Sequence, residues 1–455
     1  MVKPAVTFSD AMSRAPMRVF QWMTFAICML VLVADGIDAQ LLGIVAPYVI
    51  EEFGVDRGTF GWAMSAALVG FGLGSWAGGW LGDTIGRRWS LALAAVVFSL
   101  ATVAASQSAD VWQMAGWRLV GGLGFGSAYA NAITLASEWL PDRWRSIAVT
   151  TLSVGTPAGG FVVAAIAPML INSFGWRGSF VVLGAATLLV VVLIIAFLRD
   201  SPSFLLARGK QDAAERAARK VLVEEVELIA ERHGPAGGDG KPVGVLDRSN
   251  ARLNIGIGVT FAAAALVAYA VLSWTTTLLT GQGFDFESAA EALSVAGITS
   301  VIAAVAVGVL VRWLGSRVVL LGISSSLFVT LLWLGYEIET MPGQPDASTR
   351  LLVVALIGLA AALFSAAIAT LYAVMTYAYP PSCRSAGIGF GIFMGRVGAV
   401  AATGLGGWLL ELGGASVIPF FAVLVVGAVL ISTAAFVVDR HVPPSRREGG
   451  AAIPA

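Results

Sequence analysis

Two acidic residues, Asp35 and Asp38, lie inside an apolar run of the sequence. An ionisable side chain in the middle of a membrane helix costs about 2.5–3.5 kcal/mol or more, so such residues are rare and mark functional sites. A spacing of three residues puts both carboxylates on one face of a helix. Neighbouring carboxylates in a medium of low dielectric constant cannot both ionise cheaply, so one is expected to hold a proton. The pair is a candidate proton carrier; the alternative is a salt bridge with an arginine that only holds helices together.

Two arginines, Arg118 and Arg396, also lie within apolar runs. A guanidinium group can hold a carboxylate through two parallel hydrogen bonds. Arg396 is about 18 Å from the start of its run if the run is helical, which places it near the middle of a bilayer. We interpret Arg396 as a clamp for an anionic substrate, with a permanent bond to Asp35 or Asp38 as the alternative. For Arg118 we favour a structural or gating role.

Three further side chains, Asn131, Trp274 and Tyr372, could add hydrogen bonds and an aromatic face to such a substrate site. Ordinary packing between helices is the alternative for each of them. The sequence therefore predicts a substrate-binding set of Arg396, Asn131, Trp274 and Tyr372, beside the proton-coupling pair.

The composition excludes most other classes of protein. Of 455 residues, 57% are hydrophobic and 12% are charged, whereas soluble domains carry about 25% charged residues. Two histidines and two cysteines provide no metal-ligand cluster and no disulfide framework. No nucleophile–base pair or phosphate loop favours an enzyme, and no output domain favours a receptor. We expect no enzymatic activity, no cofactor, no metal and no nucleic-acid partner.

Apolar runs long enough to cross about 30 Å of hydrocarbon recur along the chain. They predict an all-α membrane protein with twelve transmembrane helices in two pseudo-symmetric six-helix bundles. The runs fall near residues 20–47, 59–81, 89–106, 113–139, 146–172, 176–198, 253–280, 288–311, 317–338, 350–378, 384–410 and 415–438.

The expected organisation has five parts. The stretch 210–232 has the charge pattern of an amphipathic surface helix, and 234–242 is rich in glycine and proline, which is typical of a linker. The parts are a cytoplasmic N-terminal tail (1–19), an N-terminal bundle (20–198), a cytoplasmic central loop with that helix (199–252), a C-terminal bundle (253–438) and a cytoplasmic C-terminal tail (439–455).

The distribution of basic residues predicts the orientation. Lysine and arginine concentrate in the segments on one side of the predicted helices, whereas the loops on the other side hold only Arg57, Arg177 and Arg350. Cytoplasmic loops carry the excess of basic residues. Both termini are therefore expected in the cytoplasm, with the chain in the cell inner membrane.

The two halves repeat a short motif after their second predicted helix. GWLGDTIGRR begins at Gly79 and GVLVRWLGSR begins at Gly308, with glycine, a charged residue, glycine and arginine at the same offsets. Such duplication around a central binding site is common in transporters. The residues expected to gate or brace the protein are Gly79, Asp83, Gly86, Arg87, Arg88, Arg118, Glu138, Asp142, Arg143, Arg312 and Arg317.

GWLGDTIGRR (79–88) and RLVGGLGFG (118–126) resemble motifs of the major facilitator superfamily. Within it, the chain is similar to the aromatic acid:proton symporter family. That likeness is carried by DGIDAQLLGIVAP (35–47), NAITLASEWLPDRWRS (131–146), FGWRGSFVVLG (174–184), LRDSPSFLLARGK (198–210), YAVLSWTTTLLTGQGF (269–284) and CRSAGIGFGIFMGRVGAV (383–400).

The resemblance implies proton-coupled uptake of a small organic anion, such as a benzoate or hydroxybenzoate, by alternating access. We expect a monomer in the lipid bilayer whose partners are this anion and protons. Departures from the family pattern at Arg312, Thr275 and Thr276 leave open a ligand other than the usual benzoates. The alternatives are transport of another solute and proton-driven export.

Overall fold

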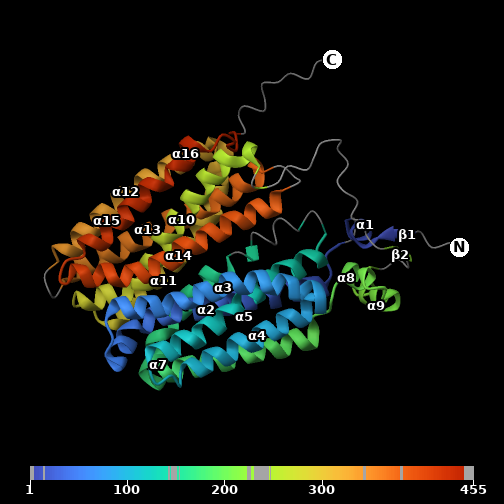
Figure 1. The fold of residues 1–455 in the computed structure, drawn as a ribbon, viewed down its shortest axis with the longest axis horizontal. Coiled ribbons are helices and arrows are strands. Elements are labelled where there is room, and N and C mark those ends of the chain that lie inside the picture. The colour runs from blue at the N-terminus through green and yellow to red at the C-terminus, as the bar shows by residue number, and fades with distance from the viewer. Residues whose placement is uncertain are drawn as a thin grey trace, which may run out of the picture. The chain divides into compact units, whose positions relative to one another are not determined.

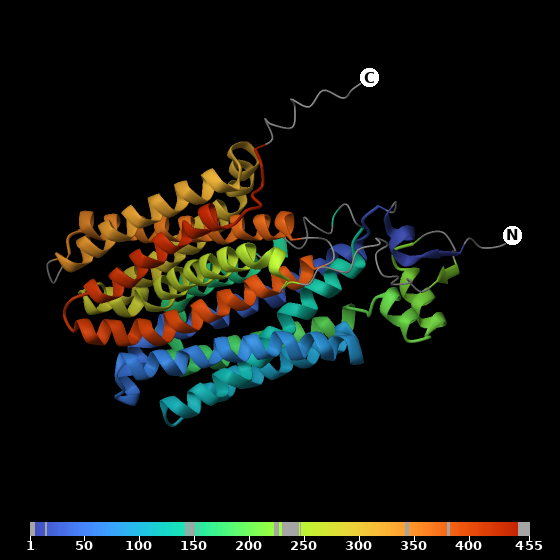
Figure 2. The same ribbon diagram turned by 45° about the horizontal axis from the view of Figure 1, so that its top comes forward.

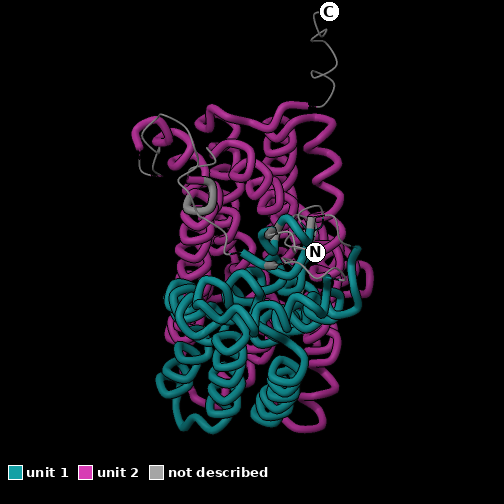
Figure 3. The backbone as a smooth tube through the Cα atoms, turned by 90° about the vertical axis from the view of Figure 1, so that its right-hand side faces the viewer, with its two compact units in different colours: residues 1–39, 69–159, 177–237 teal, residues 40–68, 160–176, 238–455 magenta. Residues whose placement is uncertain are grey.

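The computed structural model describes residues 5–13, 16–141, 144, 151–152, 154–222, 227–229, 245, 247–341, 345–379 and 383–444. The described chain is helical apart from two short strands (Figure 1). It forms two compact units, which Figure 3 distinguishes by colour. Unit 1 comprises residues 1–39, 69–159 and 177–237, and unit 2 comprises residues 40–68, 160–176 and 238–455. The division into two bundles at residues 199–252 stays a prediction.

Ten helices in the described part are long and apolar enough to cross a membrane. In a bilayer a helix satisfies its own backbone hydrogen bonds, which is why apolar runs of this length adopt it. With α3, which is not among these ten, the long helices are α2 (Val19–Phe53), α3 (Arg57–Ile85), α4 (Arg87–Ala105), α5 (Val111–Trp139), α7 (Gly155–Phe197), α10 (Ala251–Gly281), α11 (Phe286–Leu314), α12 (Ser316–Glu339), α13 (Ala347–Ala378), α14 (Arg384–Gly413) and α15 (Ile418–Ile431), which α16 (Thr433–Val437) continues.

Two of these helices explain the difference between ten and the predicted twelve. The 43-residue α7 contains Gly175 with non-helical angles of φ 66° and ψ 176°, so it holds two successive helices. Helix α3 has 29 residues, which is long enough to span, although its many glycines and tryptophans lower its hydropathy. Counted in this way, the described residues contain the twelve spanning helices that the sequence predicts.

A small folded element lies beyond the ends of the long helices and belongs to unit 1 (Figures 1 and 2). Strand β1 (Ala5–Thr7) pairs in parallel with β2 (Glu227–Ile229). Three short helices accompany the strands: α1 (Phe8–Ser13), α8 (Pro202–Ala207) and α9 (Gln211–Ala218).

This element corrects one expectation from the sequence. The helix predicted over residues 210–232 ends at Ala218, and a strand follows at Glu227. Phe8 and Leu228 are buried in the same apolar cluster as Trp139 of α5. Burial of these side chains outweighs the helical charge pattern of the segment. The predicted linker, 234–242, lies outside the described residues.

Stacked aromatic rings and close approach at glycines hold the long helices of unit 1 together. In unit 1, Phe98 of α4 stacks on Phe125 of α5 with ring centroids 4.2 Å apart. A Cβ atom on Gly124 would lie 2.8 Å from the Ala94 carbonyl oxygen, so only glycine fits there. Large apolar side chains such as Trp76 remain exposed, at 82%. That exposure is typical of a surface that faces lipid rather than water.

Candidate functional site

Asp38 and Arg118 form a buried ion pair inside unit 1. The Arg118 Nη1 to Asp38 Oδ2 distance is 2.6 Å, and the residues are 3% and 5% exposed. Arg118 Nη2 also donates to the Asp38 carbonyl oxygen at 3.2 Å, and the Thr102 hydroxyl donates to Asp38 Oδ1 at 2.7 Å. A buried charge needs such partners, because removing one of them strands the other at a cost of about 3–5 kcal/mol. The pair therefore links α2 to α5.

Asp35, also 5% exposed, lies one helical turn before Asp38 and contacts α7. The Thr156 hydroxyl donates to Asp35 Oδ2 at 3.1 Å. The neighbouring Gly36 makes this contact possible, because a Cβ atom there would overlap the Thr156 carbonyl. Gly159 is pressed in the same way against the Val33 carbonyl. Helix α2 stays regular through this stretch, so Gly36 serves close approach rather than unwinding.

Arg396 lies in unit 2 and has a different kind of contact. Its Nη1 donates to the Tyr269 hydroxyl of α10 at 2.7 Å. Near it, the Phe261 and Tyr372 rings meet edge to face with centroids 5.4 Å apart. Arg396, Tyr269 and Tyr372 are all intermediate in exposure. Unit 2 thus brings a guanidinium group, a phenol and an aromatic edge to one group of helices.

The structure favours the packing alternative for Asn131 and Trp274. Asn131 is 1% exposed, and its Nδ2 donates to the Gly78 carbonyl, the Ser90 hydroxyl and the Ser127 carbonyl at 2.8–2.9 Å. These bonds tie α3, α4 and α5 together. Trp274 is 0% exposed and meets Phe60 edge to face. Neither side chain offers an open surface to a ligand in this structure.

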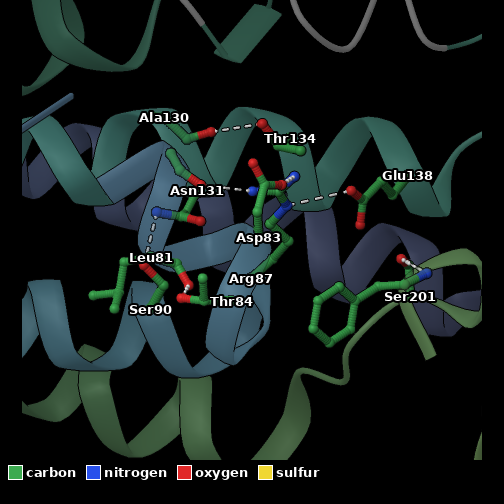
Figure 4. Close-up of polar contacts among 12 residues, drawn as sticks. Leu81, Asp83, Thr84, Arg87, Ser90, Ala130, Asn131, Thr134, Glu138 and Ser201 are labelled. Atoms are coloured by element: carbon green, nitrogen blue, oxygen red, sulfur yellow. Dashed lines mark hydrogen bonds and ion pairs between the residues drawn. The ribbon is translucent and has the colours of Figure 1, made fainter. Parts of the chain in front are cut away.

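A polar network surrounds the end of α3, as Figure 4 shows. Arg87 forms an ion pair with Asp83, and its Nε lies 3.4 Å from Glu138 Oε1. Arg87 Nη1 also donates to the Gly79 carbonyl at 3.2 Å. One guanidinium group therefore connects α3, the start of α4 and the end of α5.

The turn between α3 and α4 depends on Gly86, whose φ of 104° is rarely adopted by other residues. Asp200, which follows α7, accepts a hydrogen bond from the Arg88 backbone N–H at 3.0 Å. This carboxylate caps the start of α4, where free N–H groups and the helix dipole favour an anion. Burial raises the pKa of Asp200, and the Arg88 backbone N–H partly offsets that rise.

The matching turn in unit 2 has the same backbone but other partners. Gly315 has φ 81° and ψ 153°, close to the 104° and 147° of Gly86. The Ser316 N–H donates to the Val442 carbonyl, and the Val442 N–H donates to the Ser316 hydroxyl, both at 3.0 Å. His441 Nδ1 lies 3.1 Å from the same hydroxyl. Burial and the nearby charge of Arg317 lower the pKa of His441.

The remaining predicted gating residues are less constrained. Arg312 is exposed and forms no ion pair with any residue that the structure describes. Arg317 lies over the Phe436 ring, with its Cζ 6.0 Å from the centroid. Asp142 and Arg143 lie outside the described residues. No cluster of three or more His, Cys, Asp or Glu side chains that could hold a metal ion occurs in the described ranges.

Three contacts were not foreseen from the sequence: those of Thr102, Thr156 and Tyr269. Threonines are common in apolar helices, so nothing marked the first two. Tyr269 is one of only seven tyrosines and opens a motif that carries the family resemblance, which was the available signal.

Comparisons with known proteins agree on the type of protein. The family described as Major Facilitator Superfamily matches residues 28–342. The chain is similar to the 4-hydroxybenzoate transporter PcaK of Acinetobacter baylyi, with 29% identity over 87% of this chain and 86% of that protein. It is likewise similar to the gallate transporter of Pseudomonas putida, with 29% identity over 91% and 92%.

Among solved structures, a D-xylose-proton symporter matches with a TM-score of 0.70 and 16% identity, covering 93% of this chain and 98% of its own. The inward open conformation of the xylose transporter XylE from E. coli gives a TM-score of 0.71 at 15% identity, covering 92% of this chain and 97% of its own. At these identities the match concerns the fold alone.

Proposed function

From the premise that the chain belongs to the Major Facilitator Superfamily, as its motifs predicted, we propose that it is a secondary transporter that takes up an aromatic carboxylate together with protons. The family model covers more than half of the chain, and its members are not enzymes. The coupling, the substrate and the direction are the parts of this proposal that go beyond the family.

The observation that carries proton coupling is the buried carboxylate pair. Asp35 and Asp38 are each 5% exposed in a membrane helix, where an ionisable group is retained for function. Arg118 forms an ion pair with Asp38 at 2.6 Å. A proton that loads Asp38 would break this ion pair and release Arg118. Proton binding is thereby linked to the contact between α2 and α5, which a transporter that alternates between two states requires.

The substrate class follows from the relatives and from unit 2. Several relatives are named as transporters of aromatic acids: 4-hydroxybenzoate, gallate and benzoate. All three are carboxylates on a ring. Arg396 offers a guanidinium group for the carboxylate, and Tyr372 offers an aromatic edge for the ring. These two residues are the substrate-binding residues we propose.

The remaining parts of the proposal concern location and assembly. The one-sided distribution of basic residues supports an inner-membrane protein with both termini in the cytoplasm. We expect a monomer that needs no cofactor, because the proton gradient supplies the free energy. In the same orientation, the network of Asp83, Arg87 and Glu138 lies on the cytoplasmic side.

Uptake of labelled aromatic acids into proteoliposomes tests the proposal. With an imposed inward proton gradient, 4-hydroxybenzoate or a related acid should accumulate above its external concentration. A protonophore should abolish accumulation while leaving equilibration intact. Accumulation only when the gradient is reversed would indicate an exporter, and failure of every acid in a panel of benzoates would contradict the substrate class.

A further inference from the structure

Arg396 is held in place by close contact between α10 and α14. A Cβ atom on Gly395 would lie 2.5 Å from the Phe261 ring, and one on Gly398 would overlap the Ala262 carbonyl. Glycines therefore flank Arg396 where the two helices touch, and no larger residue fits without moving α10. This packing fixes the backbone of Arg396 relative to Tyr269.

The hydrogen bond from Arg396 to Tyr269 uses the phenol only as an acceptor. A phenol hydroxyl accepts and donates at once, so the 2.7 Å bond from Arg396 leaves the Tyr269 proton to be donated elsewhere. Within the described residues, Arg396 is the only hydrogen-bond partner of that hydroxyl. Tyr269 is intermediate in exposure, so its side chain is not enclosed on every side.

We propose that Tyr269 is a specificity-determining residue that, with Arg396, holds the carboxylate of the substrate. The guanidinium group donates to one carboxylate oxygen, and the Tyr269 hydroxyl donates to the other. The bond between the two side chains pre-orients both donors before the anion arrives, which reduces the entropy lost on binding. This inference rests on the proposed function, because it assigns the carboxylate end of the same site.

Tyr269→Phe removes the hydroxyl and keeps the ring. A hydrogen bond to a charged group is worth enough that its loss should raise KM for a benzoate about tenfold. The turnover number should change little, since the bond serves binding. Acids that differ only in ring substituents should lose affinity by the same factor, because the change concerns their shared carboxylate. The matched control is Tyr336→Phe on α12, a tyrosine that is 66% exposed.

A double-mutant cycle tests whether the two side chains act as a unit. The combined loss in Tyr269→Phe with Arg396→Lys should be clearly smaller than the product of the single losses. Independent losses that multiply would overturn the shared role, and so would an unchanged KM in Tyr269→Phe.

A second measurement does not depend on transport. Phenylglyoxal modifies arginines, and mass spectrometry can follow the peptide that contains Arg396. Tyr269→Phe should speed modification of Arg396, while Tyr336→Phe should not, and benzoate should protect the wild-type residue. If the wild type carries no aromatic acid, the proposed substrate fails, but faster labelling still supports the positioning of Arg396 by Tyr269. An equal labelling rate in both proteins would overturn it.

Discussion

Each of the two units places an arginine among membrane helices, but the two arginines contact chemically different side chains. In unit 1, Arg118 meets the carboxylate of Asp38 at 2.6 Å and is 3% exposed. In unit 2, Arg396 donates to a neutral phenol, that of Tyr269, and is only partly buried. The first arginine is bonded to a carboxylate, and the second is bonded to a phenol hydroxyl. This contrast suggests that unit 1 handles the proton and unit 2 handles the substrate.

The two glycine turns differ in a similar way. Gly86 and Gly315 share a backbone conformation that the duplicated motif preserves. Around Gly86 the partners are charged side chains, including Asp83 and Asp200. Around Gly315 they are the backbone and hydroxyl contacts of Val442 and Ser316. The repeat therefore kept its geometry while its electrostatics diverged.

The largest effect is expected in the proton site of unit 1. Asp38→Asn should abolish accumulation driven by a proton gradient, because an amide cannot cycle a proton. Asp35→Asn should act in the same direction, less severely. The measurement is uptake into energised proteoliposomes beside counterflow exchange, which needs no net proton movement.

Because Asp38→Asn strands the buried charge of Arg118, loss of folding must be separated from loss of coupling. The double variant Asp38→Asn with Arg118→Gln removes both charges and serves as the control. If it folds but still fails to accumulate substrate, coupling is lost. Accumulation by Asp38→Asn at the wild-type rate would remove the proton role from unit 1.

The next largest effect distinguishes the turn at Gly86 from the turn at Gly315. Asp83→Asn removes one carboxylate from the Arg87 network and should cut transport strongly, with a shift of the resting population toward the inward-open state. Arg312→Ala should do much less, because Arg312 is exposed and forms no ion pair with the described residues.

The reporter for this shift is Ser273→Cys. Ser273 is 7% exposed beside Gly43, so a thiol there becomes accessible from outside only when α2 and α10 separate at that point. The two natural cysteines, Cys28 and Cys383, are buried and should give little background. Asp83→Asn should lower outside labelling far more than Arg312→Ala. Equal losses in the two variants would mean that the turns gate symmetrically.

A smaller effect concerns Arg396 itself. Arg396→Lys keeps the charge but loses the planar two-point geometry, so KM for carboxylates should rise about tenfold with normal expression. Arg252→Lys, an exposed position at the start of α10, is the matched control. Unchanged affinity would mean that Arg396 braces helices and that unit 2 does not hold the anion through it.

The smallest effect is the opposite response of the two turns to acid. The pKa of His441 is lowered below 6.5, so its stabilising contribution is present above pH 6.5 and is lost as the pH falls below that value. The pKa of Asp200 is raised above 3.8, so protonation as the pH falls toward 3.8 favours the folded turn. Hydrogen exchange, corrected for its intrinsic pH dependence, should show the turn at Gly315 losing protection as the pH falls below 6.5, while the turn at Gly86 does not. His441→Gln should remove this loss, and persistence of the loss would refute the assignment.

The sequence by itself determined the twelve helices, the repeated glycine motif and the family. Hydrocarbon thickness fixes the length of an apolar span, and a positive φ at Gly86 or Gly315 selects glycine whatever surrounds it. These constraints act on single residues or single segments, so they can be read along the chain. The aspartates and arginines in the apolar runs were likewise visible because such charges are rare there.

The tertiary structure alone decided which side chains contact one another. Asp38 could have paired with Arg118 or Arg396 as far as residue types show, and Asn131 or Trp274 could have faced a ligand. The pairing with Arg118, the packing of Asn131 and the meeting of Tyr269 with Arg396 all depend on which helices touch and at what height. The strand that replaces the end of the predicted helix at 210–232 has the same origin, because its partner β1 lies more than two hundred residues away in the chain. Contacts between distant segments follow from packing in three dimensions, which local pattern and composition do not encode.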